Sequence, residues 1–167
     1  MLVIGIDPGI AITGYGLIQE NSDGSVQCVD YGVIRTSANV TPEKRLQILY
    51  EEIGKILLLH HPACAGVEKL FFQHNVKTAM AVGQARGVAM LALAQAHIEV
   101  SEYTPNEVKQ SLTGYGAAKK DQVQQMVKTV LNLPEIPQPD DAADALAVAF
   151  CHLNCKHMND AVKDSES

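Results

Sequence analysis

Two acidic residues follow apolar runs that have the composition of buried strands. Asp7 comes after residues 2–6, and Glu68 comes after residues 63–67. Burying a bare carboxylate has a prohibitive free-energy cost, so each acid must lie at a solvated strand end or beside a cation. If the two strands are neighbours in one sheet, the two carboxylates converge at the same edge. For either residue alone, an acid in an ordinary turn is an equally good interpretation.

A third group of acids lies in the segment PDDAAD, residues 139–144. Asp141 and Asp144 are three residues apart, so on a helix they share a face, with Cβ atoms about 5–6 Å apart. Acids that follow a proline at a helix start also cap free amide groups and favour the helix dipole, and this role alone explains Asp140. Asp144 lies one turn further along, between alanines on the side expected to pack, so capping explains it less well.

These positions form a set of four carboxylates: Asp7, Glu68, Asp141 and Asp144. Carboxylates gathered in one place repel one another unless cations lie between them. Divalent ions that prefer oxygen ligands are the usual compensation. The pattern therefore indicates a site for Mg²⁺ or Mn²⁺.

Two other groups of potential metal ligands are weaker. One lies near the C-terminal end, and because its spacing matches no familiar zinc site we interpret it as incidental: Cys151, His152, Cys155 and His157. The other is the pair His60 and His61 at a predicted helix end. We expect that pair to contact terminal carbonyl groups instead of a metal.

Basic residues are concentrated in the middle of the chain. Residues 69–128 contain seven Lys or Arg and four Asp or Glu, a net charge of +3, which leaves −9 for the rest of a chain whose total is −6. A basic face beside the carboxylates is compatible with phosphate binding, although solvated helix lysines explain any single one. Phe71, in a predicted loop after Glu68, is either a core residue or an aromatic that stacks on exposed bases.

Composition limits the class of protein. The chain has 167 residues, of which 47% are hydrophobic and 19% charged, which fits one globular domain with a real core. The net charge of −6 argues against binding nucleic acid through overall charge. No apolar run approaches the roughly 20 residues of a membrane span, and the first residues do not resemble a signal peptide. We therefore expect a cytoplasmic protein whose four cysteines are reduced thiols.

The periodicity predicts a single α/β domain. Three strands joined by short turns open the chain, and strands then alternate with helices, which predicts an antiparallel start followed by β/α units. Strands are expected at residues 2–6, 13–19, 26–36, 63–67 and 98–103. Helices are expected from about 42 to 60, 76 to 96, 105 to 113, 123 to 131 and 140 to 153. The polar residues after 154 are expected to be frayed. The helix from 76 is apolar nearly all round, so it is buried or covered by a partner. Gly83 and Gly87 would allow close approach of another helix or tight packing on the chain's own sheet.

Five separated motifs carry a resemblance to a known family. They are GIDPGIAITGYGLI, GVEKLFF, GQARGVAMLALA, PNEVKQSLTGYGAAKKDQVQQMV and DDAADALAVA. In this order and spacing the chain resembles the RuvC family of bacterial Holliday junction resolvases along nearly its whole length. The resemblance implies an RNase H-like mixed five-stranded sheet flanked by helices in one nuclease domain, residues 1–156, with a polar, disordered tail at 157–167.

The resemblance also implies an activity and partners. The implied protein is a homodimer that nicks two strands of a four-way DNA junction in homologous recombination and DNA repair, and each nick leaves a 5′ phosphate. Each site would hold two Mg²⁺ ions, for which Mn²⁺ could substitute. The branch-migration helicase complex of RuvA and RuvB would be a further partner. In such a mechanism a pair of ions about 3.5–4 Å apart activates the attacking water and neutralises the leaving oxygen.

Individual residues match the family's functional positions. The catalytic and metal-binding acids are matched by Asp7, Glu68, Asp141 and Asp144. The doubled acid at 140–141 leaves the register of the third ligand open by one residue, and the spacing to Asp144 favours Asp141 over Asp140. The basic residues near the cleaved strand are matched by Lys109 and Lys120, or by Lys119 in place of Lys120 in the alternative register. The aromatic residue that stacks on bases is matched by Phe71. The helix of the dimer interface is matched by the one that carries Gly83 and Gly87.

Two other classes of function are kept as alternatives. An actin-like or sugar-kinase-type ATP-binding protein also carries an acid and glycines after its first strand, but it needs a second lobe for which this chain lacks the length. A non-catalytic junction-binding module would be favoured by the loss of one of the four carboxylates, and none is missing.

Overall fold

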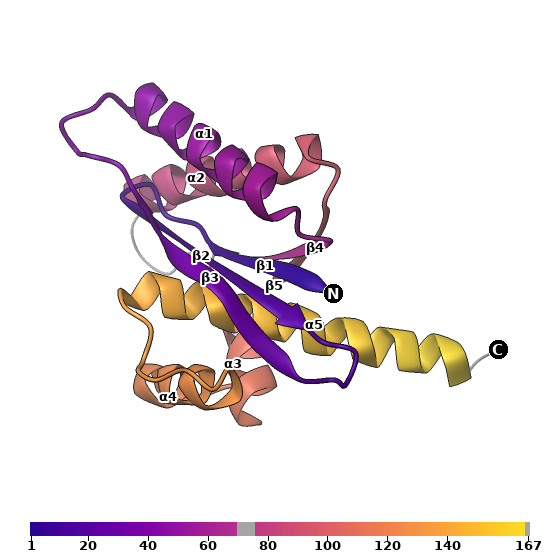
Figure 1. Ribbon diagram of the computed structural model, residues 1–167. Helices are drawn as coiled ribbons and strands as arrows, with labels where there is room; N and C mark the ends of the chain where they lie inside the picture. Colours follow the sequence, from indigo (N-terminus) through magenta and orange to yellow (C-terminus); the bar gives the residue numbers. More distant parts are fainter. Residues whose placement is uncertain (70–75, 166–167) are drawn as a thin grey trace.

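One mixed five-stranded sheet forms the centre of the molecule (Figure 1). The computed structural model describes the backbone of residues 1–69 and 76–165 and the side chains of residues 1–69 and 79–159. The strand order is β3-β2-β1-β4-β5. The strands are β1 (Leu2–Asp7), β2 (Ile12–Glu20), β3 (Val26–Arg35), β4 (Cys64–Glu68) and β5 (Glu99–Tyr103). Strands β1 to β3 pair antiparallel and β4 and β5 continue parallel to β1, which confirms the predicted mixed sheet.

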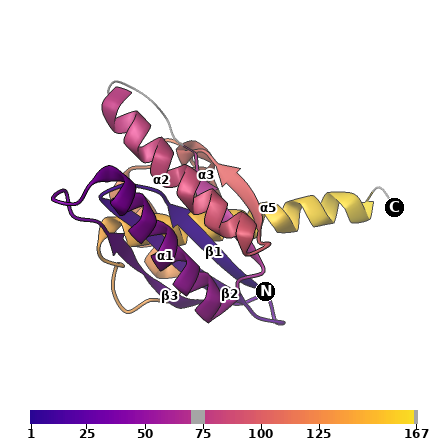
Figure 2. The ribbon, with the colours of Figure 1, turned by 90° about the horizontal axis from the view of Figure 1, so that it is seen from above.

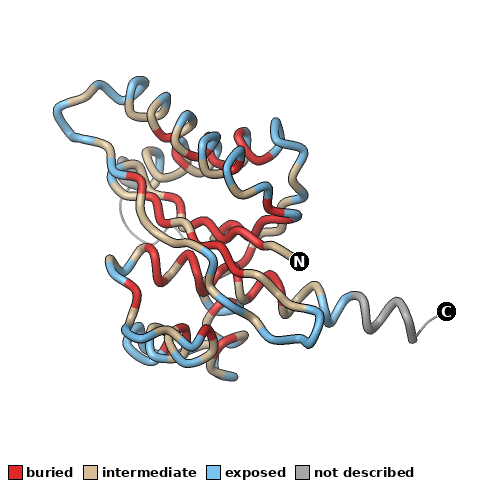
Figure 3. Tube along the Cα trace, in the orientation of Figure 1, coloured by how far each residue is buried: buried red, intermediate tan, exposed pale blue. Residues whose placement is uncertain are grey.

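Helices cover both faces of this sheet. One face carries α1 (Pro42–His60) and α2 (Val76–Gln95), and the other carries α3 (Pro105–Thr113), α4 (Lys120–Val130) and α5 (Asp140–Ser165) (Figures 1 and 2). Each layer has its own apolar core, which contains Leu49 and Leu93 on the first face and Val127 and Leu146 on the second. Buried residues accordingly follow the strands and the inward sides of the helices (Figure 3).

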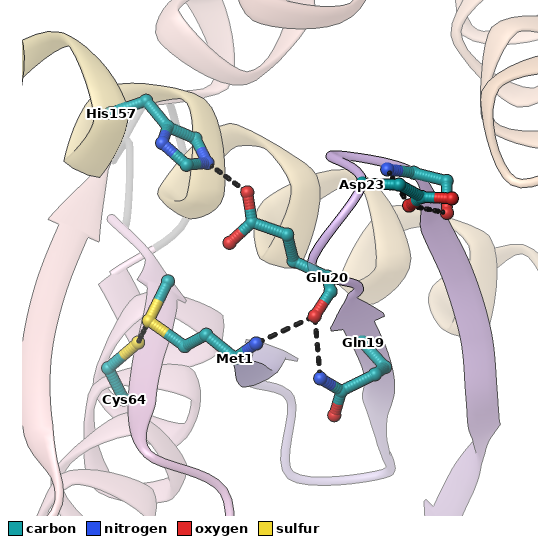
Figure 4. Close-up of polar contacts among 7 residues, drawn as sticks. Met1, Gln19, Glu20, Asp23, Cys64 and His157 are labelled. Carbon is teal, nitrogen blue, oxygen red and sulfur yellow. Dashed lines mark hydrogen bonds and ion pairs between the residues drawn. The ribbon is translucent and has the colours of Figure 1, made fainter.

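Helix α5 extends further than the sequence indicated. The predicted end near residue 153 was wrong, because the helix continues to Ser165 and projects past the sheet (Figures 1 and 2). Once its first half is packed on the sheet, adding a residue to an existing helix needs no apolar partner. An ion pair of 2.6 Å between His157 Nε2 and Glu20 Oε1 ties the extension to the end of β2 (Figure 4). The main-chain oxygen of Glu20 also accepts a hydrogen bond of 2.7 Å from the Met1 ammonium group.

Glycines let α5 lie directly on the sheet. A Cβ atom built on Gly5 would lie 2.1 Å from the main-chain oxygen of Ala145, and one built on Gly14 would lie 1.9 Å from that of Asp141. Real Cβ atoms do not approach other atoms so closely, so a larger residue at either of these two positions would push the helix away. The close approach fixes the start of α5 above the ends of β1 and β2.

Candidate active site

The carboxyl ends of β1 and β4 bring the first two acids together. These strands pair in parallel, with Ile6 opposite Val67, so Asp7 and Glu68 leave the sheet side by side. A side-chain hydrogen bond links the two carboxyl groups, and it raises the pKa of Asp7 while lowering that of Glu68. The contact therefore favours the protonated form of Asp7 and the ionised form of Glu68.

The electrostatics at Asp7 disfavour its ionised form. Burial is the largest cause, followed by the negative charges of Glu68 and Asp144, with a smaller contribution from Asp141, and together they raise the pKa of Asp7 to about 8. Burial also raises the pKa of Glu68, because it outweighs the hydrogen bond from Asp7 and the positive charges of nearby lysines. Perturbation of this size in a group of acids is typical of functional sites.

Helix α5 carries the other two acids to the same edge. Asp7 pairs across the sheet with Gly14, and the main chain of Asp141 lies against Gly14. Asp144 lies one turn further along α5, close enough to Asp7 and Glu68 for its charge to raise the pKa of both. Residues from β1, β4 and α5 are thus gathered at one end of the sheet, and all four side chains are partly exposed.

Two lysines lie beside these acids. A small cavity of about 190 Å³ is lined by Glu68, Pro105, Val108, Lys109, Lys120, Val123, Asp144 and Ala147. Lys109 is carried by α3, whose start is fixed by a capping box in which the Thr104 hydroxyl accepts from the Glu107 N–H at 3.3 Å. Lys120 is the first residue of α4, and its ammonium lies 3.1 Å from Asp144 Oδ2. The exposed Lys119 is not part of the cavity wall.

The first residue of α5 has a partner that the sequence did not indicate. Capping alone was expected for Asp140, but its Oδ2 atom lies 3.2 Å from the ammonium nitrogen of Lys120. Contacts from Gln124 and Lys120 lower the pKa of Asp140. For Lys120, the contacts with Asp144 and Asp140 outweigh burial and raise its pKa. Asp140 is therefore an ion-pair partner of the lysine at the site.

The donor set suits a divalent ion. Among the described side chains, those of residues 1–69 and 79–159, no three His, Cys, Asp or Glu already stand in a geometry that holds a metal. The negative charge of the group is instead reduced by the raised pKa of Asp7 and by the ammonium group of Lys120 beside Asp144. Carboxylate oxygens are the ligands that Mg²⁺ and Mn²⁺ prefer, and an ion would replace the Asp7 proton. Asp7, Glu68, Asp141 and Asp144 therefore fit such a group.

The remaining predicted positions lie elsewhere. Phe71 lies outside the described residues. Gly87 is exposed on the outer side of α2, with no atom within 4 Å of an added Cβ, and Gly83 is partly buried. Large apolar side chains flank Gly87 on that surface, with Met80 64% and Leu91 51% exposed.

The histidine and cysteine groups have structural contacts. His152 is buried, and its Nδ1 atom lies 2.8 Å from the Tyr103 hydroxyl. His61 follows the end of α1 and donates its main-chain N–H to the Leu57 oxygen at 3.0 Å, as a helix-end contact requires. The expectation for His60 was wrong, because its Nε2 atom lies 3.2 Å from Asp30 Oδ2 instead of a terminal carbonyl group.

Sequence reasoning missed the glycines that bring α5 to the acids. Gly14 and Gly16 in β2 and Gly5 in β1 face the helix backbone. The available signal was the occurrence of glycine inside strands, which often marks close approach of another backbone.

No described helix is both long enough and apolar enough to cross a membrane.

Comparison with known proteins identifies the family. The family described as "Crossover junction endodeoxyribonuclease RuvC" matches residues 3–152. Relatives with that name include one from Roseiflexus sp., 56% identical over 155 residues that cover 93% of this chain and 92% of the relative. Another, from Ruminiclostridium cellulolyticum, is 54% identical over 159 residues that cover 95% of each chain.

Solved structures agree with the sequence comparison. The structure of Thermus thermophilus RuvC superposes with a TM-score of 0.89 at 34% identity, covering 95% of this chain and 97% of the other. T. thermophilus RuvC in complex with a Holliday junction substrate gives a TM-score of 0.87 at 32% identity, covering 95% and 96%. The yeast mitochondrial Holliday junction resolvase, at 15% identity and a TM-score of 0.64, shares the fold. The chain therefore belongs to the RuvC family of crossover junction endodeoxyribonucleases.

Proposed function

We propose that the carboxylates at the ends of β1, β4 and α5 are the site at which this endonuclease cuts the strands of four-way DNA junctions in recombination and repair. The observation that carries the proposal is the meeting of Asp7 with Glu68, Asp144 and Asp141, which raises the pKa of Asp7 to about 8. The substrate follows from the relatives, since T. thermophilus RuvC has been seen with a Holliday junction substrate.

The proposed cofactor is Mg²⁺, held as two ions by Asp7, Glu68, Asp141 and Asp144, with Mn²⁺ as a substitute. When bound, such ions supply a water with a lowered pKa and neutralise charge on the phosphate oxygens. Asp7 would hold an ion only in its ionised form, which burial and the neighbouring acids disfavour in the metal-free protein. Glu68, Asp141 and Asp144 gather at the same end of the sheet as Asp7 and would supply the remaining oxygen ligands.

Lys109 and Lys120 are proposed to bind the DNA backbone at the site. Both line the cavity beside Glu68 and Asp144, where an ammonium group stabilises charge that grows on a phosphate during cleavage. Lys119 is exposed outside the cavity wall, which favours Lys120 over Lys119 for this role. Phe71 is proposed to stack on bases near the crossover, on the strength of its sequence motif alone. The products would be a 5′ phosphate and a 3′ hydroxyl.

A homodimer formed through α2 is proposed as the active species. The exposed positions Met80, Gln84, Gly87 and Leu91 recur at intervals of four and three residues, which places them on one stripe of the helix. A four-way junction has two equivalent strands to cut, and a two-fold dimer supplies two equivalent sites.

RuvA and RuvB are proposed partners, and the cytoplasm is the proposed location.

A labelled four-way junction tests the proposal. We expect the purified protein to nick two opposed strands with Mg²⁺ and none when a chelator is present. Asp7→Asn should abolish nicking and retain junction binding, whereas the control Glu52→Gln, in α1 on the other face of the sheet from α5, should cut as the wild type does. Nicking by Asp7→Asn at the wild-type rate would contradict the site. Hydrolysis of ATP, or binding without any nicking, would instead support one of the two alternative classes.

A further inference from the structure

We propose that Asp140 is a positioning residue that holds Lys120 over the carboxylate site. This inference rests on the proposed function, because it concerns the lysine assigned there to the scissile phosphate. Asp140 itself is not among the four proposed metal ligands, and its carboxylate stands outside that group. The role is distinct from capping, since it acts through the side chain of a residue on another helix.

The geometry gives the lysine two carboxylate partners. Lys120 Nζ lies 3.1 Å from Asp144 Oδ2 and 3.2 Å from Asp140 Oδ2. Lys120 begins α4 and Asp140 begins α5, so the contact joins the first residues of two helices that start at the same end of the molecule. Because both acids are on one helix, the ammonium group is held between them and directed toward the cavity that it lines.

The two partners differ in what else they face. Asp144 is 30% exposed and lies within reach of the charges of Asp7 and Glu68, so its oxygens belong to the carboxylate group. Asp140 is 52% exposed, its Oδ2 atom lies 3.2 Å from Lys120 Nζ, and it is not one of the four proposed metal ligands. Its oxygens thus remain for Lys120 whatever occupies the acids of the site. Asp140 is the partner that can hold the ammonium group throughout the reaction.

The position of the lysine makes such a partner necessary. The first turn of a helix carries a partial positive charge, so a lysine there is disfavoured unless an acid compensates it. Lys120 is also 54% exposed, and a long exposed side chain samples many rotamers when nothing restrains it. An ion pair with Asp140 restricts those rotamers to ones that place the charge beside Asp144. Removal of the Asp140 charge should therefore leave Lys120 present but less often in place.

A double-mutant cycle separates this role from capping. The variants are Asp140→Asn, which keeps a good capping group, Asp140→Glu, which keeps the charge, and Lys120→Met, which keeps the length of the lysine stem. Asp121→Asn is the matched control, because it removes one exposed acid from the first turn of α4. Among the described residues, Asp121 forms no ion pair. Each variant is compared in cleavage of a saturating junction and in urea unfolding with a chelator present.

We expect Asp140→Asn to slow cleavage about two- to fivefold, the range of one partly exposed ion pair. Asp140→Glu should recover most of the rate, and Asp121→Asn should cut as the wild type does. In the Lys120→Met background, Asp140→Asn should leave the cleavage rate unchanged, and it should lower the urea midpoint by less than it does when Lys120 is present, because its interaction with the helix dipole remains. The urea comparison reports the contact without metal, DNA or activity.

Two results would overturn the inference. An equal effect of Asp140→Asn with and without Lys120, in either measurement, would mean that Asp140 acts independently of the lysine. Full activity of Asp140→Asn would mean that the contact has no role in cleavage. Failure of the wild type to cut any junction would contradict the proposed function instead, and the urea cycle would still decide whether the contact exists.

Discussion

A Cβ atom on Gly14 would lie 1.9 Å from the main-chain oxygen of Asp141. The strand that pairs with the Asp7 strand and the helix that carries two further acids are thus in backbone contact, without a side chain between them. That contact sets how far Asp141 and Asp144 stand from Asp7. A glycine, whose side chain is a single hydrogen atom, therefore determines the dimensions of the carboxylate site.

Gly14→Ala should damage both stability and activity. The added methyl group must displace the start of α5, and overpacking of this kind typically lowers the free energy of unfolding by about 1–3 kcal/mol. We expect cleavage to fall at least about tenfold, since a shift of about 1 Å in a catalytic group can have a larger effect. Urea unfolding and junction cleavage measure the two effects. Gly54→Ala in α1 is the control, because no atom lies within 4 Å of its added Cβ. That control should instead be more stable by about 1 kcal/mol.

The stability of the metal-free protein should fall as the pH rises. The pKa of Asp7 is about 8 in the folded protein against an ordinary value of 3.8, so the folded chain binds the proton more tightly than the unfolded chain. Its stabilising contribution is complete below about pH 4 and is lost as the pH rises through about 8. Asp7→Asn should weaken this dependence and be more stable than the wild type at pH 8, by on the order of a few kcal/mol. Equal urea midpoints for the two proteins at pH 8 would contradict the assignment of the proton to Asp7.

Binding of Mg²⁺ should release a proton near neutral pH. The carboxyl group of Asp7 is largely protonated at pH 7, and a ligand oxygen must be deprotonated. We therefore expect the apparent affinity for Mg²⁺ to increase up to about pH 8, and the heat of binding to depend on the ionisation enthalpy of the buffer. Calorimetry at pH 7 in two buffers measures the proton. Asp7→Asn should show no such buffer dependence, and a wild type without it would refute the coupling.

Gly87→Arg should separate the proposed dimer without unfolding the subunit. No atom lies within 4 Å of a Cβ at this position, and replacing glycine within a helix favours the helical state by up to about 1 kcal/mol. A bulky charge in the centre of the exposed α2 stripe should prevent a second copy from packing there. We expect a monomer in sedimentation that keeps its melting temperature and loses paired nicking. A wild-type monomer that resolves junctions fully would refute the dimer.

The sequence predicted the strands of the site better than the approach of its last helix. Asp7 and Glu68 could be placed at strand ends because an acid directly after an apolar run must reach solvent or a cation, and two parallel strands bring such ends together. The distance between α5 and the sheet could not be predicted, because it depends on which strand glycines face the helix. The Asp140–Lys120 contact was missed because it joins two helices whose relative position no local pattern encodes. The length of α5 was missed because polar residues continue a helix as readily as they end one.

The order of the acids along the chain has a consequence for synthesis. Asp7 emerges from the ribosome with the first strand, whereas Asp141 and Asp144 arrive with the last helix. A nascent chain that ends after α4 has two of the four acids, and the glycine-lined face of its sheet is bare. The proposed carboxylate site is therefore incomplete until the first turn of α5 has been synthesised.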